Sequence, residues 1–365
     1  METDERGSAA PEFDLGRLLT EHGLLDDEAP GIELAGDGNI NWVWRVRSRR
    51  SGRSVVVKHA RPALARFPQY ETSTERIVFE HRWFEIAQRV DPANVCPAIL
   101  HFDEKRRLLV LEDLGGAERL DAALLRGAPV EGVAAAEAVE GLEAGLVTLA
   151  DFLGRVHAAT RDDASLNARF RNDDIRRLHG DHIFVLPYAE NDFPLADEVA
   201  RRASELRREG RVGEIAARAY ERYLEPQGAL VHGDVQAGNV LLAPGGPKLL
   251  DAEIAHVGDP AFDVGTLLAH DWLGALATGR DGASIAARAA RVWDAHRASS
   301  SGGSAGEAVG FADVARYAGL EMMRRTIGAA RVAAVESVAA SLAAIRAAER
   351  LVLDPPDDPR KVALA

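Results

Sequence analysis

The residue spacing with the most chemical content lies in the segment LVHGDVQAGNVLL, residues 230–242. Asp234 follows a short apolar run and a glycine, and Asn239 lies five residues later. A carboxylate can orient a hydroxyl group and accept its proton, and an amide oxygen can bind Mg²⁺. Kinases use the spacing Asp-x4-Asn for these two roles, so the segment predicts chemistry in which a phosphoryl group is transferred to an alcohol.

A second acidic pair follows in KLLDAEIAHVGDPAFDVG, residues 248–265. Asp251 ends an apolar strand-like run, and Glu253 would face the same side if the backbone is extended. Two carboxylates directed at one point repel each other unless a cation lies between them, which favours a metal site over ordinary loop turns. We assign Asp263 a structural role, as the N-cap of a helix that begins at Val264.

Two further segments could bind a nucleotide. Glycines in a turn between two strand candidates would let backbone N–H groups approach phosphate oxygens, although such a turn also suits an ordinary hairpin. This turn is made of Gly36, Asp37, Gly38 and Asn39. The apolar run 110–114 leads into two glycines and predicts a hinge whose backbone, at Glu112 and Leu114, would bind adenine.

A charged pair connects the first strands to the first long helix. Lys58 ends the apolar run 55–57, where an inward-facing ammonium needs an anionic partner. Glu80 has apolar neighbours three and four residues away and so lies on the apolar face of a helix over residues 73–89. We expect the Lys–Glu ion pair that positions the α- and β-phosphates in kinases. The alternative is an exposed helical pair between Glu80 and Arg76.

The surrounding pattern predicts an α+β, protein-kinase-like bilobal fold with a small β-rich N-lobe and a larger helical C-lobe. Strand patterns dominate the first third, and two glycines at 115–116 separate it from a remainder rich in Ala, Leu and Arg. The predicted parts are a disordered tail (1–13), an N-terminal nucleotide-binding lobe (14–114) and a helical catalytic and substrate lobe (115–365). Helices are expected at 136–160, 193–224, 280–297 and 311–350.

Composition narrows the function classes. The chain has 365 residues, a formal net charge of −13 and no Lys/Arg block, which argues against a nucleic-acid partner. A run of about 18 apolar residues is missing, so no membrane span is expected. The acidic start lacks a signal core, and the single cysteine, Cys96, fits a reducing cytoplasm. A homodimer is left open as an assembly.

The combination HGDxxxGN, then D-x-E, then FDVG resembles the aminoglycoside phosphotransferase and choline kinase superfamily. This resemblance implies that ATP and Mg²⁺ are the cofactors and that Asp234 is the catalytic base. It also implies that Asn239 and Asp251 ligate Mg²⁺, that Glu253 supports the metal site, and that His232 braces the loop.

Four segments resemble the 5-methylthioribose kinase branch: GDGNINWVWRV, VVVKHARP, ILHFDEKRRLLVLEDL and MMRRTIGAARVA. In the last of these, Arg324 and Arg325 match an arginine pair that, by resemblance, holds the substrate or stabilises charge on the transferring phosphoryl group. Adjacent helical residues point about 100° apart, so both reach one pocket only if the helix begins or ends there. Otherwise one of them is a surface residue.

The resemblance implies transfer of the γ-phosphate of Mg-ATP to a hydroxyl of a small molecule, with a 5-methylthioribose-like sugar as the leading acceptor. An aminoglycoside, choline or another amino alcohol is the alternative acceptor. A protein kinase is disfavoured, because about ten residues between Asp251 and Asp263 leave little room for a peptide platform. From a different class, a catalytically inactive nucleotide-binding module would have lost Lys58, Asp234 or Asn239, and all three are present.

Overall fold

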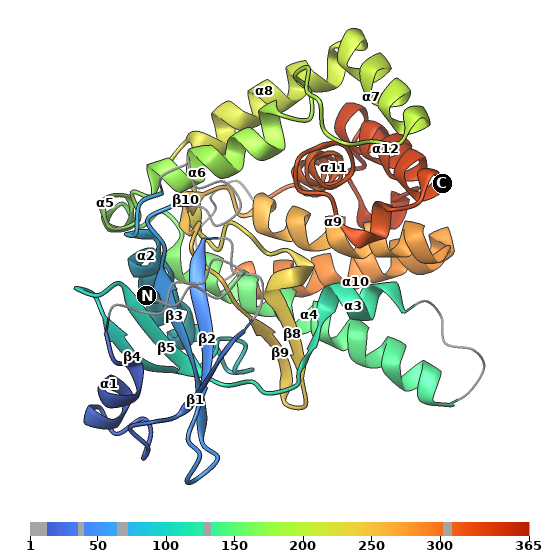
Figure 1. Ribbon diagram of the computed structural model, residues 1–365. Coiled ribbons are helices and arrows are strands. Elements are labelled where there is room, and N and C mark those ends of the chain that lie inside the picture. Colours follow the sequence, from blue (N-terminus) through green and yellow to red (C-terminus); the bar gives the residue numbers. More distant parts are fainter. Residues whose placement is uncertain (1–12, 36–39, 64–71, 127–132, 302–308, 365) are drawn as a thin grey trace. The chain divides into compact units, whose positions relative to one another are not determined.

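The computed structural model describes residues 13–35, 40–63, 72–126, 133–301 and 309–364. The chain forms two compact units. Unit 1 comprises Met1–Glu85 with Pro97–Gly116, and unit 2 comprises Ile86–Cys96 with Ala117–Ala365. Unit 1 carries an antiparallel sheet and unit 2 is mainly helical (Figure 1). The predicted α+β class, with a small β-rich part and a larger helical part, is confirmed.

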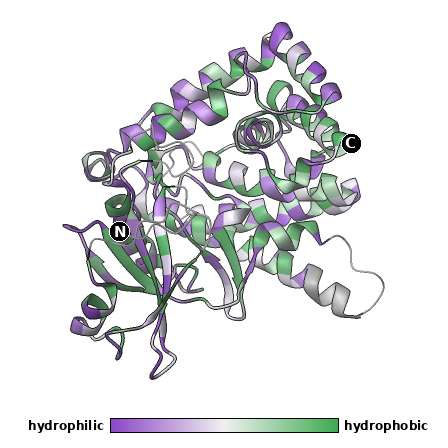
Figure 2. Cartoon of the chain, in the orientation of Figure 1, coloured by the Kyte–Doolittle hydropathy of each residue, from purple (hydrophilic) through white to green (hydrophobic). Residues whose placement is uncertain are grey.

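The sheet of unit 1 has five antiparallel strands in the order β1-β2-β3-β5-β4. They are β1 (Gly31–Leu34), β2 (Asn41–Arg47), β3 (Ser54–Ala60), β4 (Ile99–Asp103) and β5 (Leu108–Glu112). Alternate residues of β2 and β3, among them Trp44 and Val57, pack with α1 (Leu15–Glu21) on one face. Residues of β5 pack with α2 (Arg76–Ala87) in a second cluster. The central strands β3 and β5 therefore contribute to clusters on both faces, whereas β1 at the edge is mostly exposed. Hydrophobic residues, green in Figure 2, run along the central strands.

Unit 2 is built from helices around two small sheets, β7-β10 and β6-β8-β9. Its strands are β6 (Glu118–Arg119), β7 (Ala229–Val231), β8 (Val240–Ala243), β9 (Gly246–Leu249) and β10 (His256–Gly258). Its α-helices are α3 (Leu120–Leu125), α4 (Val133–Thr160), α5 (Ser165–Arg169), α6 (Asp173–Gly180), α7 (Asp197–Glu209), α8 (Arg211–Leu224), α9 (Ala261–Thr278), α10 (Gly282–Ser300), α11 (Phe311–Ile327) and α12 (Val338–Leu353).

Short helical segments complete the chain: η1 (Gln88–Val90), the π-helix η2 (Asp181–Val185), η3 (Ala237–Asn239), η4 (Ala333–Val335) and η5 (Pro359–Lys361). Within the part of the chain that the structure describes, no helix has the length and apolar character needed to span a bilayer.

Two of the predicted helices are wrong, because each is two helices. Residues 193–224 contain α7 and α8, which are separated by Gly210 in the left-handed conformation, with φ of 74°. Residues 311–350 contain α11 and α12, and α11 ends where Gly328 becomes extended. Glycine tolerates both breaks, whereas the Ala- and Arg-rich sequence on either side remains helical. The predictions for 136–160 and 280–297 agree with α4 and α10 to within a few residues.

Helix α9 is the core of unit 2, since every residue from Ala261 to Ala275 is buried. It packs against α11, and the two helices lie side by side in Figure 1. Gly265 allows this close approach. A Cβ at this position would lie 2.8 Å from both the Cβ of Tyr317 and the backbone oxygen of Val314. The helices α9 and α11 can therefore lie this close only because residue 265 is a glycine and has no side chain.

Substitution of Gly265 should separate the two helices. In Gly265→Ala the new methyl group must displace α11 backbone, and we expect a loss of about 1–3 kcal/mol in the free energy of unfolding, measured in urea. Gly141→Ala in α4 is the matched control, because nothing lies within 4 Å of the added Cβ. It should stabilise its helix by up to about 1 kcal/mol. Equal effects of the two substitutions would contradict the close-packing argument.

Candidate active site

The loop that joins β7 to β8 is held by a buried carboxylate. Asp263 Oδ2 accepts the His232 N–H at 2.8 Å, and Asp263 Oδ1 accepts the Gly233 N–H at 2.9 Å. Burial alone would raise the pKa of Asp263, but the ring of His157, at 3.2 Å, and these N–H groups outweigh it and lower the pKa. The predicted N-cap role is wrong: α9 begins at Ala261, and Asp263 binds the backbone of the loop.

Gly233 and His232 shape the loop just before Asp234. Gly233 has φ of 83°, and a Cβ there would lie 2.7 Å from the backbone oxygen of Ile254. His232 Nδ1 is 3.3 Å from the N–H of Asp234, and its Nε2 is 3.1 Å from the Leu250 oxygen. A carbonyl oxygen only accepts, so Nε2 carries the proton and the ring is neutral. Burial lowers the pKa of His232, in agreement with this assignment and with a bracing role.

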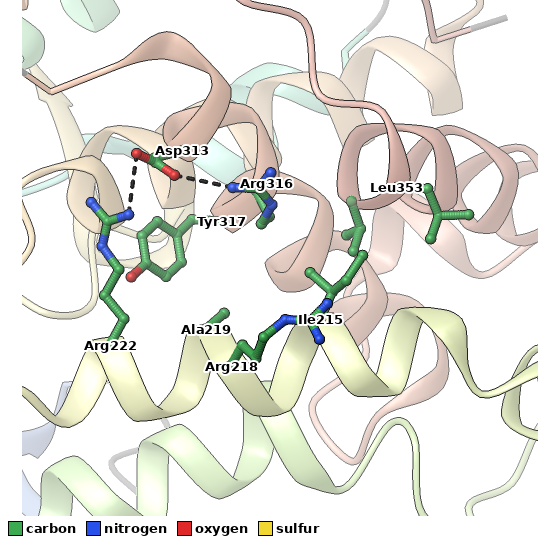
Figure 3. A pocket seen from close by; sticks show the side chains of 9 residues that line it. Ile215, Arg218, Ala219, Arg222, Asp313, Arg316, Tyr317 and Leu353 are labelled. Carbon is green, nitrogen blue, oxygen red and sulfur yellow. Dashed lines mark hydrogen bonds and ion pairs between the residues drawn. The ribbon is translucent and has the colours of Figure 1, made fainter.

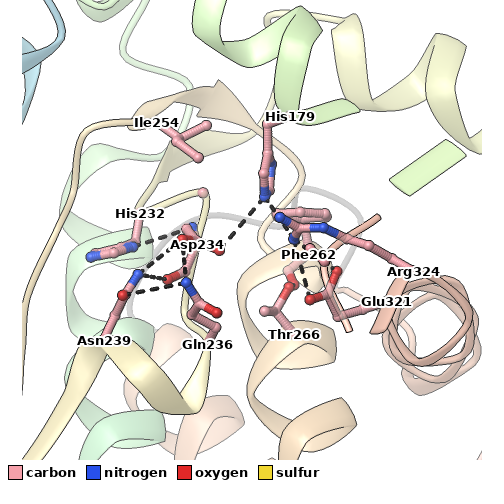
Figure 4. A network of polar contacts seen from close by, with 12 residues as sticks. His179, His232, Asp234, Gln236, Asn239, Ile254, Phe262, Thr266, Glu321 and Arg324 are labelled. Atoms are coloured by element: carbon pink, nitrogen blue, oxygen red, sulfur yellow. Dashed lines mark hydrogen bonds and ion pairs between the residues drawn. The ribbon is translucent and has the colours of Figure 1, made fainter. Parts of the chain in front are cut away.

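Asp234 and Asn239 are brought together, as their spacing predicted (Figure 4). Asp234 Oδ2 accepts hydrogen bonds from Asn239 Nδ2 at 2.9 Å and from Gln236 Nε2 at 3.0 Å. Asp234 Oδ1 is buried and has no hydrogen-bond partner among the described residues. A cation is near it, with Arg325 Nη2 at 3.9 Å. The loop thus holds Oδ2 of the carboxylate by two hydrogen bonds, while Oδ1 receives none from the described residues.

The arginine pair lies in the last turn of α11, and both side chains are buried. The helix ends at this point, as is needed for both arginines to reach one pocket. The alternative, that one arginine is a surface residue, is wrong. Glu321 pairs with both: Arg325 Nε lies 2.6 Å from Oε1, and Arg324 Nη1 lies 3.2 Å from Oε2. Burial would raise the pKa of Asp234, but the positive charges of Arg324 and Arg325 hold it well below its usual range. The carboxylate is therefore ionised.

His179 is a site residue that the sequence did not indicate. It comes from α6, is buried, and its Nε2 lies 3.0 Å from Arg324 Nη1 and 3.6 Å from Asp234 Oδ1 (Figure 4). Because arginine can only donate, Nε2 accepts and the ring proton lies on Nδ1. Burial and Arg324 lower the pKa of His179. Glu321, also missed, could have been found from its i, i+3 and i, i+4 spacing to the arginines.

Two of the three predicted metal ligands, Asn239 and Asp251, lie close to each other along neighbouring backbone segments. The N–H of Leu250 donates to the oxygen of Asn239 at 2.8 Å, which puts Asp251 beside Asn239. Asp251 has φ of 65°, so the predicted extended backbone from Asp251 to Glu253 is wrong. Glu253 is buried, and its backbone oxygen accepts from Asn172. Left-handed backbone at a non-glycine residue is uncommon and is often found at functional sites.

These donors suit magnesium. Amide and carboxylate oxygens are hard ligands, and Mg²⁺ is commonly bound by one or two carboxylates together with phosphate oxygens and water. The described residues include no group of three or more His, Cys, Asp or Glu that could hold a metal ion on their own. The donor set therefore fits a metal shared with phosphates better than a closed protein cage.

In unit 1 the predicted ion pair is present. Lys58 Nζ lies 2.7 and 2.8 Å from the two carboxylate oxygens of Glu80, and both residues are buried. The alternative of an exposed pair between Glu80 and Arg76 is wrong, because Arg76 is buried and donates to the backbone oxygens of Ser73 and Arg61.

The structure describes two of the other predicted nucleotide-binding residues, Glu112 and Leu114. Glu112 uses its N–H within unit 1, where it donates to the Ala98 oxygen at 3.0 Å, and Leu114 follows β5 in irregular backbone. The turn made of Gly36, Asp37, Gly38 and Asn39 lies outside the described residues. Since unit 1 holds Lys58 and unit 2 holds the loop with Asp234, the meeting of the two sets stays a prediction.

A pocket of about 1030 Å³, its open mouth included, adjoins the loop within unit 2. Gln236 lines it and also binds Asp234, and His270 lines it and lies 3.5 Å from Glu321. Most of the remaining wall is aliphatic and includes Leu124, Leu125, Leu273, Val332, Ala333 and Ala334. Asp121, the carboxylate in the wall, is paired with Arg119 at 2.6 Å.

Known proteins resemble this chain in both sequence and fold. Residues 31–299 match the family described as "Phosphotransferase enzyme family". The chain belongs to this family and is a kinase that acts on hydroxyl acceptors. It is similar to the methylthioribose kinase of Yersinia enterocolitica serotype O:8 / biotype 1B, with 28% identity over 340 residues, 83% of this chain and 82% of the relative. The methylthioribose kinase of Bacillus cereus strain AH187 is 25% identical over 341 residues, 87% and 84% of the two chains.

Solved structures support the fold. Choline kinase from Cryptosporidium parvum Iowa II gives a TM-score of 0.53 at 12% identity and covers 92% of this chain and 94% of its own. An amicoumacin kinase in complex with AMP-PNP, Ca²⁺ and Ami gives 0.52 at 14% identity, with 95% and 96% covered. At these identities the likeness shows a shared kinase-like fold.

The Asp263 carboxylate should control turnover through the loop. In Asp263→Asn an NH₂ group replaces one acceptor and faces a backbone N–H of His232 or Gly233. We expect the loop to shift and kcat to fall about 100-fold, measured as substrate-dependent ADP release. The control is Asp281→Asn at the start of α10, where asparagine can replace the cap that accepts the N–H of Ser284. Turnover within twofold of wild type in Asp263→Asn would refute the constraint.

Buried histidines should make stability fall in mild acid. Burial lowers the pKa of His256 and of His296 to about 3, against about 6.5 in an unfolded chain. Between these values the unfolded state binds protons that the folded state does not. The free energy of unfolding should therefore decrease below pH 6.5, by about 1 kcal/mol per pH unit for each ring. Urea unfolding at pH 7.5, 6.5 and 5.5 measures this slope. His256→Asn removes one of the titrating rings, so the slope should become shallower by about 1 kcal/mol per pH unit. A slope unaffected by that variant would contradict the assignment.

Proposed function

We propose that the protein is an ATP-dependent kinase that transfers the γ-phosphate of Mg-ATP to a hydroxyl of a 5-methylthioribose-like sugar, with Asp234 as the catalytic base. The observation that carries the proposal is the free oxygen of Asp234. Oδ1 belongs to a buried, ionised carboxylate and has no hydrogen-bond partner among the described residues. Arg325 Nη2 lies 3.9 Å from Oδ1, and it is also buried without a hydrogen-bond partner among the described residues. A substrate hydroxyl between them would donate to Oδ1 and accept from Nη2.

The chemistry follows from these groups. The acceptor hydroxyl gives its proton to Asp234 Oδ1 as its oxygen bonds to the γ-phosphorus, and the bond from that phosphorus to the β–γ bridging oxygen breaks. ADP leaves, and the proton passes to solvent. The depressed pKa of Asp234 suits a loose transition state, in which the base orients the alcohol and accepts its proton late. Arg324 and Arg325 would stabilise charge on the transferring group.

The nucleotide would be held by the other predicted residues. Asn239 and Asp251 would ligate Mg²⁺, with Glu253 in support, and the metal when bound would offset phosphate charge. Lys58, oriented by Glu80, would bind the α- and β-phosphates. The backbone of the turn at 36–39 would contact phosphate, and the backbone at Glu112 and Leu114 would contact adenine.

The pocket beside the loop supports a sugar with an apolar substituent. Its aliphatic wall, with Leu124, Leu273 and Val332, suits a methylthio group. None of the described residues that line it is Phe, Tyr or Trp, the residues that bind quaternary ammonium groups such as that of choline. The carboxylate of Asp121 is already paired with Arg119, so the wall offers little attraction to a polycationic aminoglycoside.

The test is ADP release with 5-methylthioribose, choline or kanamycin as acceptor. Wild type should turn over 5-methylthioribose, and Asp234→Ala should reduce kcat about 10³-fold or more while ATP still binds. Asp174→Ala, an exposed carboxylate in α6, is the control and should keep wild-type turnover. Turnover of choline or kanamycin in place of the sugar would overturn the acceptor. ATP binding without acceptor-dependent release would instead favour an inactive nucleotide-binding module.

A further inference from the structure

A second pocket in unit 2 lies among residues of α8, α11 and α12 (Figure 3). It has a volume of about 680 Å³, its open mouth included. Three arginines line it: Arg218 and Arg222 from α8, and Arg316 from α11. None of them is among the residues assigned above to phosphoryl transfer. Three guanidinium groups around one pocket are notable in a chain whose net charge is −13.

The nearby carboxylates only partly neutralise this rim. Arg222 pairs with Asp259 at 2.7 Å and with Asp313 at 3.2 Å. Arg316 shares Asp313, at 3.0 Å. Arg218 is exposed and makes no hydrogen bond or ion pair with any described residue. Two carboxylates thus face three guanidinium groups, each with five N–H donors, so donors and about one positive charge remain.

A buried hydroxyl in the same pocket also lacks a partner. Tyr317 is 4% exposed, and its Oη has no hydrogen-bond partner among the described residues. Figure 3 shows its hydroxyl end directed toward the Arg222 side chain. A buried polar atom left unpaired costs stability, which a ligand oxygen would recover. The ring of Tyr317, with Ile215, Ala219 and Leu353, adds an apolar surface.

We propose that this pocket binds a small organic phosphate monoester. Arginines from two helices, and the tyrosine hydroxyl, can donate to different terminal oxygens of one phosphoryl group, whereas a carboxylate offers only two oxygens. The organic part would pack on the Tyr317 ring and Leu353. The ligand would contact α11 two turns before Arg324, and through Arg222 it would reach Asp259, just before α9. Occupancy would thus bear on two elements that carry active-site groups.

Isothermal titration of the full chain tests the site. Phenyl phosphate is the probe, inorganic phosphate and benzoate are the comparisons, and a non-hydrolysable ATP analogue is present at saturation to occupy the nucleotide site. We expect phenyl phosphate to bind at least tenfold more tightly than either comparison. Arg218→Ala and Arg316→Ala should each weaken it about tenfold. Arg208→Ala, an exposed arginine of α7, should leave it unchanged.

Tyr317→Phe separates binding from folding. It keeps the ring and removes only the unpaired hydroxyl, so the melting temperature should not fall, while affinity for phenyl phosphate should drop about fivefold. The proposal is overturned if phenyl phosphate does not bind, or if its affinity is the same in both arginine variants as in wild type. Equal affinity for benzoate would overturn the phosphate assignment, and equal affinity for inorganic phosphate would overturn the apolar contact.

Discussion

The arrangement of the site depends on one buried carboxylate. Asp263 accepts hydrogen bonds from two consecutive backbone N–H groups that would otherwise be unpaired in the core. It is supported in turn by His157, whose Nδ1 lies 3.0 Å from Nε2 of His296 on α10. Polar groups that satisfy one another in a low-dielectric interior form a stiff network. This network fixes the loop before any substrate binds, so Asp234 starts from a defined position.

Charge balance explains how so many ionised groups are buried beside that loop. Asp234 and Glu321 supply two negative charges, and Arg324 and Arg325 supply two positive charges. His270, the ring next to Glu321, has its pKa lowered by burial and adds no charge. A cluster near neutrality costs less to bury than isolated ions. Its geometry is still incomplete, because Asp234 Oδ1 and Arg325 Nη2 are too far apart for a good hydrogen bond.

The sequence was most informative where the chemistry is local. The Asp234–Asn239 spacing lies within one loop, and the pairing of Lys58 with Glu80 follows from strand and helix periodicity. The predictions that failed involve contacts between residues that are far apart in the sequence. His179 comes from a helix without a chemical motif and meets Arg324 across 145 residues. Asp263 was interpreted by a rule for its own helix, while its partners lie 30 residues earlier. Strong helix formers on both sides concealed the breaks at Gly210 and Gly328.

The close approach of α9 and α11 at Gly265 has a consequence for divergence within this family. Gly265 is two residues from Asp263, so the same stretch of α9 sets both the position of the loop that carries Asp234 and the distance to the helix that carries the two arginines. The aliphatic wall of the pocket beside Asp234 comes largely from other segments, α3 and η4, with Leu273 contributed by α9. Substitutions in α3 and η4 can therefore change this wall while the stretch of α9 that positions Asp234 and the arginines is kept.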